Sequence, residues 1–364
     1  MRPAPHRARM ALLALLVLGL VGLGGCEGCG RQIHFTPAGS VSIGVHSADS
    51  LRALVRHAQE LWDATEGGEE AAQTTAVILR EDLQVHPGEP WARRARVLLD
   101  SLDFGAELAA DRRVLAVNFF ARSRPDAGAW PWLFWRTPRG VVMRSLSGRN
   151  LQLVQVATLP DTTGNLEAWA QLAVLFARRS AAGREPLVMV WGAPAGESWN
   201  PSQTLGADSL GGVGTVEIAS AGDTAIVLTA RTFRGMPRFE ECATCPHVYA
   251  LHRFRWGPGG FARIEDRAVP SPYSSFVQFI LALGAGDRET AARFVTDPAL
   301  LEQARLFEFN ALPKGAWRAA PATDESAGTM VFFRGQQEAY QVSFEPRGED
   351  WLINAIRPTT RSIE

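Results

Sequence analysis

The spacing of apolar residues changes from a helical to a strand-like period near Arg113, and this change limits the folds that the chain can adopt. Upstream, apolar residues recur every third or fourth position, as they do along one face of an α-helix. Downstream, short apolar runs alternate with turn-forming stretches such as 137–140 and 257–260, which combine proline with glycine. Such short connections join antiparallel strands, because a parallel crossover needs about a dozen residues. The sequence therefore predicts an α+β protein with a central antiparallel β-structure.

Three helices are expected before this change. The first follows a cap at Asp49 or Ser50, the second covers about 69–85, and the third begins at Pro90. An aspartate or serine at the cap position and a proline in the first helical position both favour the start of a helix. Together these signals predict a helical segment over residues 41–110.

The central part contains stretches that have the apolar content and alternation of β-strands. These stretches are 114–120, 130–135, 141–146, 151–159, 187–191, 213–218, 225–232, 248–256 and 261–265. The stretch 166–179 fits either an amphipathic helix or a long strand. We expect a mainly antiparallel β-domain over 111–270, as a sandwich, a partial propeller or a curved sheet.

Helix signals return after Pro270 and are followed by alternating strands. Ser271 is a helix cap, Pro272 opens the helix behind it, and Asp287 caps the next one. After a third helix, strands are expected at 329–333, 340–344 and 351–356.

This order of helices and a closing meander resembles the NTF2-like superfamily. Residues 279–283 with the following Gly286-Asp287, and the closing stretch 351–353, are similar to segments of that superfamily. The resemblance implies an α+β domain over 271–364 whose concave sheet face could hold a small ligand. It implies no particular activity, because one fold serves many functions.

The amino terminus has the pattern of a secretory signal. Arg2, Arg7 and Arg9 precede an apolar run over 10–23, which ends in small residues. The run is shorter than the ~20 residues that span a bilayer core, and no other apolar stretch is long enough. From this pattern alone, the amino terminus could be cleaved to give a soluble product, remain uncleaved as a helical anchor, or be cleaved and lipidated.

The sequence Leu23-Gly24-Gly25-Cys26 resembles the lipobox of bacterial lipoproteins. The resemblance implies a signal peptide over 1–25, a diacylglycerol on the Cys26 thiol, and a tether over 26–40. It places the protein in the cell envelope, lipid-anchored on the extracytoplasmic side, and we expect the outer membrane facing the periplasm. The membrane would then be one partner, and an envelope protein a possible second.

Charge and motifs remove several classes of function. The chain has 37 Lys+Arg and 38 Asp+Glu and no basic block, so we predict no binding to nucleic acid. It has no Gly-x-Ser-x-Gly elbow, His-Glu-x-x-His motif, P-loop or calcium loop. We therefore predict no cofactor, no metal site and no enzymatic activity.

The clearest local motif is Cys242-Ala-Thr-Cys245-Pro-His247, with His252 shortly after it. An exported chain favours a disulfide between Cys242 and Cys245, which would clamp a loop between strands. A thioredoxin-like couple needs the first cysteine at a helix N-terminus, and no helix is expected here. Zinc could use both cysteines with His247 and His252, although metal sites usually take ligands from two separate pairs.

Two other groups of side chains offer weaker signals. Trp130, Trp132 and Phe134 share one strand face, which could stack on a glycan or pack in the core. Asp103 and Glu107 could share a helical face, where such carboxylates usually form a solvated surface.

The sequence as a whole predicts a lipid-anchored envelope protein that acts as a non-enzymatic interaction or assembly module. The first alternative is a ligand- or glycan-binding lipoprotein that uses an NTF2-like pocket or the tryptophan-rich face. The second alternative is a thiol–disulfide redox protein.

Overall fold

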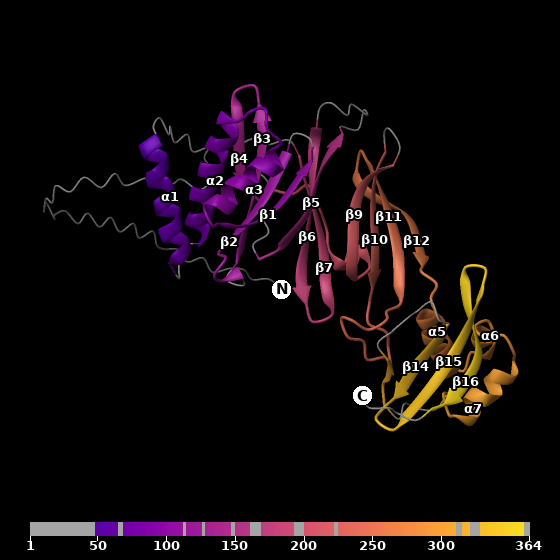
Figure 1. The fold of residues 1–364 in the computed structure, drawn as a ribbon. Helices are drawn as coiled ribbons and strands as arrows, with labels where there is room; N and C mark the ends of the chain where they lie inside the picture. Colours follow the sequence, from indigo (N-terminus) through magenta and orange to yellow (C-terminus); the bar gives the residue numbers. More distant parts are fainter. Residues whose placement is uncertain are drawn as a thin grey trace, which may run out of the picture. The chain divides into compact units, whose positions relative to one another are not determined.

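The computed structural model describes a set of ranges that begins at residue 48. These are 48–64, 68–111, 114–125, 128–146, 150–160, 169–192, 200–221, 225–310, 315–320 and 328–359. The signal, Cys26 and the expected tether lie outside them. The described part is α+β, as predicted, and consists of seven helices and four four-stranded antiparallel sheets (Figure 1). Among the described residues, no helix is both long and apolar enough to span a membrane.

Three helices precede the first sheet. The helices are α1 (Ala48–Asp63), α2 (Gly68–Val85) and α3 (Trp91–Ser101), and the strands are β1 (Gly105–Asp111), β2 (Val114–Phe120), β3 (Ala129–Thr137) and β4 (Gly140–Ser145). The expectation of helix up to residue 110 is wrong at its end, because Gly105–Asp111 pairs along its whole length with β2. Glu107 consequently lies on a strand, where its carboxylate accepts hydrogen bonds from Asn118 Nδ2 (3.0 Å) and the Leu153 amide (2.7 Å).

The second and third sheets continue the meander. Their elements are β5 (Gln152–Pro160), β6 (Trp169–Ser180), β7 (Gly183–Gly192), β8 (Gln203–Leu205), α4 (Ala207–Leu210), β9 (Val213–Ala221), β10 (Ala225–Phe233), β11 (Tyr249–Gly257) and β12 (Gly260–Ala268). Residues 169–179 of the ambiguous stretch belong to strand β6, and residues 166–168 lie outside the described ranges.

Consecutive sheets share hydrophobic clusters. One cluster joins the helices to the first sheet, a second joins the first sheet to the second, and a third joins the second to the third. On β6, Leu172 and Val174 face the first sheet while Ala173 and Leu175 face the third. Because both faces are buried, the run is apolar without a period. The central part is therefore a succession of packed meanders rather than a two-sheet sandwich.

The C-terminal part has its own cluster. Its elements are α5 (Pro272–Gly284), α6 (Arg288–Ala292), α7 (Ala299–Leu306), β13 (Trp317–Ala319), β14 (Thr329–Arg334), β15 (Glu338–Arg347) and β16 (Asp350–Pro358). Ser271 and Ser274 form a reciprocal capping box at the start of α5, as the cap signal predicts.

Aromatic rings fill the space between α5 and the fourth sheet. Phe276 stacks on Phe332 with ring centroids 3.8 Å apart, and contacts Trp317 edge-on at 5.2 Å. All three side chains are buried. A ligand in this position would have to displace core side chains.

Candidate functional site

The segment 234–248, which connects β10 to β11, runs along the free edge of the fourth sheet. Phe239 forms a parallel bridge with Trp317 of β13. The Trp317 amide donates to the Arg238 carbonyl (2.8 Å), and the Glu240 amide donates to the Trp317 carbonyl (2.8 Å). The connecting segment thus adds a short strand to β13 and fixes the cysteine motif beside that edge.

The cysteine motif forms a tight turn. Cys242 and Cys245 are joined by a disulfide with Cα atoms 5.0 Å apart, which confirms the predicted pairing. The Cys245 amide donates to the Cys242 carbonyl at 3.0 Å, and the described segment 234–248 contains no helix. Neither sulfur therefore receives the helix-dipole stabilisation that a thioredoxin-like thiolate needs.

A buried polar group lies behind this turn. The Tyr273 hydroxyl donates to Glu241 Oε1 (2.8 Å), and Glu241 Oε2 lies 3.4 Å from His247 Nδ1. Burial, and then the charge of Glu241, raise the pKa of Tyr273, so the phenol stays protonated and keeps donating. The His247 ring stacks on Phe233 at 3.5 Å, and its Nε2 has no hydrogen-bond partner among the described residues. These contacts tie the connecting segment to both α5 and β10.

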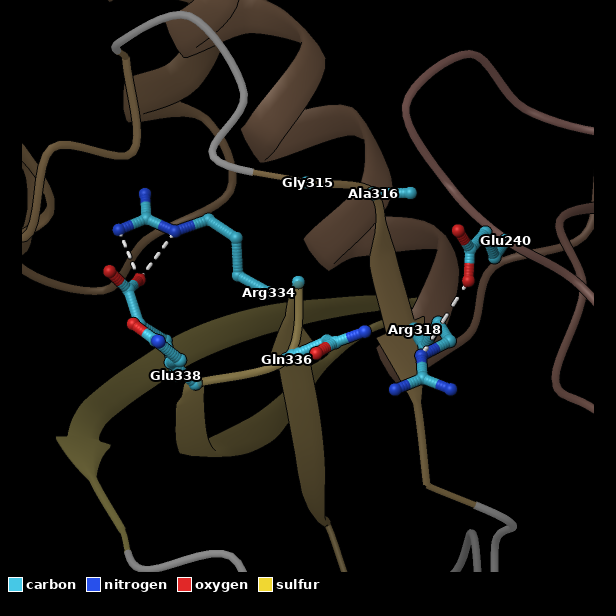
Figure 2. A pocket seen from close by; sticks show the side chains of 9 residues that line it. Glu240, Gly315, Ala316, Arg318, Arg334, Gln336 and Glu338 are labelled. Atoms are coloured by element: carbon cyan, nitrogen blue, oxygen red, sulfur yellow. Dashed lines mark hydrogen bonds and ion pairs between the residues drawn. The ribbon is translucent and has the colours of Figure 1, made fainter.

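Two hollows lie along the edge of β13, and Glu240 and Arg318 line both of them. The larger, of about 570 Å³, is lined by Glu240, Gly315, Ala316, Arg318, Arg334, Gly335, Gln336, Gln337 and Glu338. The smaller, of about 410 Å³, is lined by Glu240, Glu241, Cys242, Cys245, Arg318, Ala319, Ala320 and Phe333. We call the two together the β13 groove. Figure 2 shows Arg318 next to Glu240 on one side of the larger hollow, with Nε and Oε2 3.7 Å apart.

Arg334 forms the other wall of the larger hollow, and its hydrogen-bonding groups are already committed (Figure 2). Its Nε donates to Glu338 Oε2 (2.6 Å), and its terminal nitrogens donate to the carbonyls of Glu308 (3.0 Å) and Phe307 (2.9 Å). Arg318 is therefore the cation in the groove with donors to offer a ligand.

The zinc alternative does not assemble. His252 is buried elsewhere, with Nδ1 3.0 Å from Asp266 Oδ1, and burial lowers the pKa of its imidazole. Across the described ranges, no three His, Cys, Asp or Glu side chains gather in a metal-binding group.

The tryptophan-rich face is covered by helices. Trp130 packs on Trp62 of α1 with centroids 5.8 Å apart, and a Cβ added to Gly68 of α2 would collide with its ring. Trp132 packs against the same helix–sheet cluster. The indoles therefore serve packing here and do not form an open platform for a sugar.

Sequence reasoning missed the groove. Glu240 and Arg318 come from segments far apart in the chain, and β13 is only three residues long. The local signal was a charged residue, Arg318, between two apolar residues. A pattern of three residues is too short to indicate the alternation of a strand.

Comparisons with known proteins give little to add to this geometry. No family model matches the sequence, and no curated protein matches it. Among solved structures, the periplasmic gluconolactonase of Pseudomonas aeruginosa is similar over 70% of this chain and 72% of its own, at 12% identity and a TM-score of 0.16.

This similarity corrects one expectation. The sequence predicted a chain without enzymatic activity, but the similar structure is an enzyme by name, so we withdraw that prediction. A TM-score of 0.16 gives no ground for assigning the lactonase activity to this chain. The comparisons found no match to the NTF2-like superfamily either, and that resemblance is not confirmed.

Proposed function

We propose that this chain is a lipid-anchored extracytoplasmic interaction module whose β13 groove binds an extended segment of an envelope protein. The anchor rests on the lipobox resemblance at Cys26. The binding role rests on one observation, which is the polar groove at a sheet edge that is only partly paired.

The backbone at this edge favours an extended ligand. The Ala316 carbonyl accepts from the Gly335 amide just after β14, and the Ala320 amide donates to the Val331 carbonyl of β14. Both backbone groups of Trp317, in contrast, bond to segment 238–240. Along a β-strand, the backbone amide and carbonyl of one residue point to one neighbouring strand, and those of the next residue point to the opposite side. The amide and carbonyl of Ala319 therefore point to the same edge as those of Trp317, away from β14. Ala319 also lines the smaller hollow. An extended peptide could extend the pairing there, as in β-strand addition.

The side chains of the groove suit a polar ligand of mixed charge. Arg318 is 39% exposed and Glu240 65% exposed, and their separation of 3.7 Å makes only a weak ion pair. Each can therefore exchange its partner for a charge on the ligand at small cost. The exposed carboxamide of Gln337 adds donors and an acceptor.

Site-specific photo-crosslinking in intact envelopes tests this role. A photoreactive residue at Gln337 should give a discrete crosslinked species, and a second substitution, Arg318→Glu, should weaken it. The control places the photoreactive residue at Val97 on α3, which is 56% exposed and outside the groove. Equal crosslinking from Val97, or no effect of Arg318→Glu, would refute the groove as the binding site.

The anchor is tested separately by fractionation. Cys26→Ser should remove lipid modification and shift the protein from the membrane to precursor or soluble fractions. Membrane partition at the wild-type level and size would show that the anchor assignment is wrong.

A second candidate, thiol–disulfide exchange, is favoured by one observation. Cys242 is exposed and lines the smaller hollow, so an external thiolate could reach its sulfur. The carboxylates of Glu240 and Glu241 beside it would repel such a thiolate, which makes this candidate the weaker one.

A further inference from the structure

The β6–β7 hairpin extends beyond the hydrophobic clusters that hold its sheet. Ala177 is the last buried residue of β6, and Pro186 is the first buried residue of β7. The strands nevertheless remain paired as far as Ser180 and Gly183 (Figure 1). This end of the hairpin, residues 178–185, is called the hairpin tip below.

The hairpin tip carries three exposed arginines, Arg178, Arg179 and Arg184. The register places Arg179 directly opposite Arg184, and Arg178 opposite Glu185. Like charges in a directly opposite pair destabilise a sheet, so the first pairing is unfavourable in the isolated protein. Within the described part of the chain, none of the three guanidiniums has a hydrogen bond or ion pair.

The turn between the strands leaves these guanidiniums accessible. Ala181 and Ala182 at its centre are exposed and small, and the Ser180 hydroxyl donates to the Gly183 carbonyl (3.2 Å). No bulky side chain at the turn would hold a flat surface away from the arginines.

We propose that the hairpin tip docks on an anionic phospholipid surface. A guanidinium offers two parallel donors that fit phosphate oxygens, and it loses its hydration more readily than an ammonium. An anionic surface would turn the repulsion between Arg179 and Arg184 into a favourable term for binding. The proposal takes its setting from the proposed membrane anchor, but its chemistry depends only on the hairpin tip.

Vesicle binding by the mature polypeptide without its lipid tests the proposal. A chain that starts at Glu27 keeps every residue of the described structure and removes the anchor from the measurement. It should cosediment with vesicles of phosphatidylcholine that contain about one-third phosphatidylglycerol, and less with pure phosphatidylcholine. Binding should weaken at high salt, because exposed charges are screened.

Paired variants locate the contact. Arg179→Gln with Arg184→Gln should lower the affinity about 30-fold, because each basic residue near such a surface contributes about fivefold. Replacing both by lysine should retain most of the binding. The matched control is Arg93→Gln with Arg96→Gln, which removes the same charge from exposed positions on α3.

Several results would overturn the proposal. They are equal binding to the two kinds of vesicle, an equal loss in the α3 control, and unchanged binding in the folded hairpin variant. Near-ultraviolet circular dichroism confirms folding, which the variant should retain because it removes a repulsive pair. None of these results bears on crosslinking at Gln337 or on fractionation of Cys26→Ser, so failure here is separable from failure of the proposed function.

Discussion

Arg334 provides the sharpest test of how the C-terminal part is stabilised. Only 5% of this residue is exposed, and its guanidinium carbon lies 5.3 to 5.8 Å from the ring centroids of Phe309, Trp317 and Tyr340. Its donors satisfy Glu338 and two carbonyls that end the α7 region. A buried charge of this kind is stable only while all its partners remain.

We expect Arg334→Leu to destabilise the protein by about 3 kcal/mol. Breaking a buried ion pair from one side costs about 3–5 kcal/mol, because the remaining charge loses its partner. The lower end applies here, since the Glu338 side chain is 28% exposed and still accepts from the Tyr340 hydroxyl (2.9 Å). Hydration of the partly exposed Glu338 carboxylate recovers some of this free energy. The variant also loses the cation–π contacts and the donors to the Phe307 and Glu308 carbonyls, and this further cost keeps the total at about 3 kcal/mol.

Urea unfolding followed by near-ultraviolet circular dichroism measures this cost, because Trp317 lies within the affected cluster. The control Arg305→Leu breaks an exposed ion pair with Glu302 (2.9 Å) and should cost below about 1 kcal/mol. Adding Glu338→Leu to Arg334→Leu should recover part of the loss, because no charge then remains unpaired. A cost for Arg334→Leu no larger than that of the control would refute this reasoning.

Three further predictions follow from the titrating groups and the disulfide. Burial and the Glu338 hydrogen bond raise the pKa of Tyr340 to about 12, so the contribution of Tyr340 to the free energy of unfolding should be constant below about pH 10 and fall as the pH rises from there to about 12. Tyr340→Phe should make the alkaline fall in unfolding curves smaller, and the rest of the fall comes from other groups such as Tyr273, whose pKa is also raised. Burial lowers the pKa of His252, so stability should be complete above about pH 6.5 and fall on acidification below it, with a smaller fall in His252→Gln when urea midpoints are compared. Replacing Cys242 and Cys245 with serine should cost at most about 2 kcal/mol, and alkylation with and without reductant should find them joined; recovery of Cys242 as a reactive thiolate would contradict a structural role.

Strand positions were predictable where apolar and polar residues alternate, or where turn-forming residues enclose a short apolar run. Residues 114–120 were expected as a strand and form β2. The stretch 166–179 was ambiguous, because Leu172 to Ala177 is apolar at every position. Only the presence of a sheet on each side, which no local pattern reveals, explains why that segment is extended.

The missed elements are short or polar, and tertiary contacts stabilise them. Strand β1 contains Glu107 and Asp111, which gave no apolar alternation, yet their carboxylates hold the first sheet to the second. The Asp111 carboxylate accepts from both the amide and the hydroxyl of Thr158 at 2.6 Å. Domain boundaries stay predictions, and the structure adds that Phe239 already packs on the C-terminal cluster, well before the expected start at Ser271.

The third sheet shows why the succession of meanders stops where it does. Leu228 and Ala230 of β10 face the second sheet, so the intervening Thr229 and Arg231 lie on the opposite face.

On that opposite face, Arg231 is paired with Leu251, and Leu251 with Arg267. Arg231 and Arg267 are exposed, and burying them under a fourth meander would cost several kcal/mol for each guanidinium left unpaired. A charged face therefore ends the succession, whereas helices α1 to α3 cover its other end. With no further sheet to join, the chain enters its last part directly after β12, at α5. The segment between β10 and β11 also reaches that part, because Phe239 bridges Trp317 of β13. The contacts of that segment with β13 create the groove that we propose as the binding site.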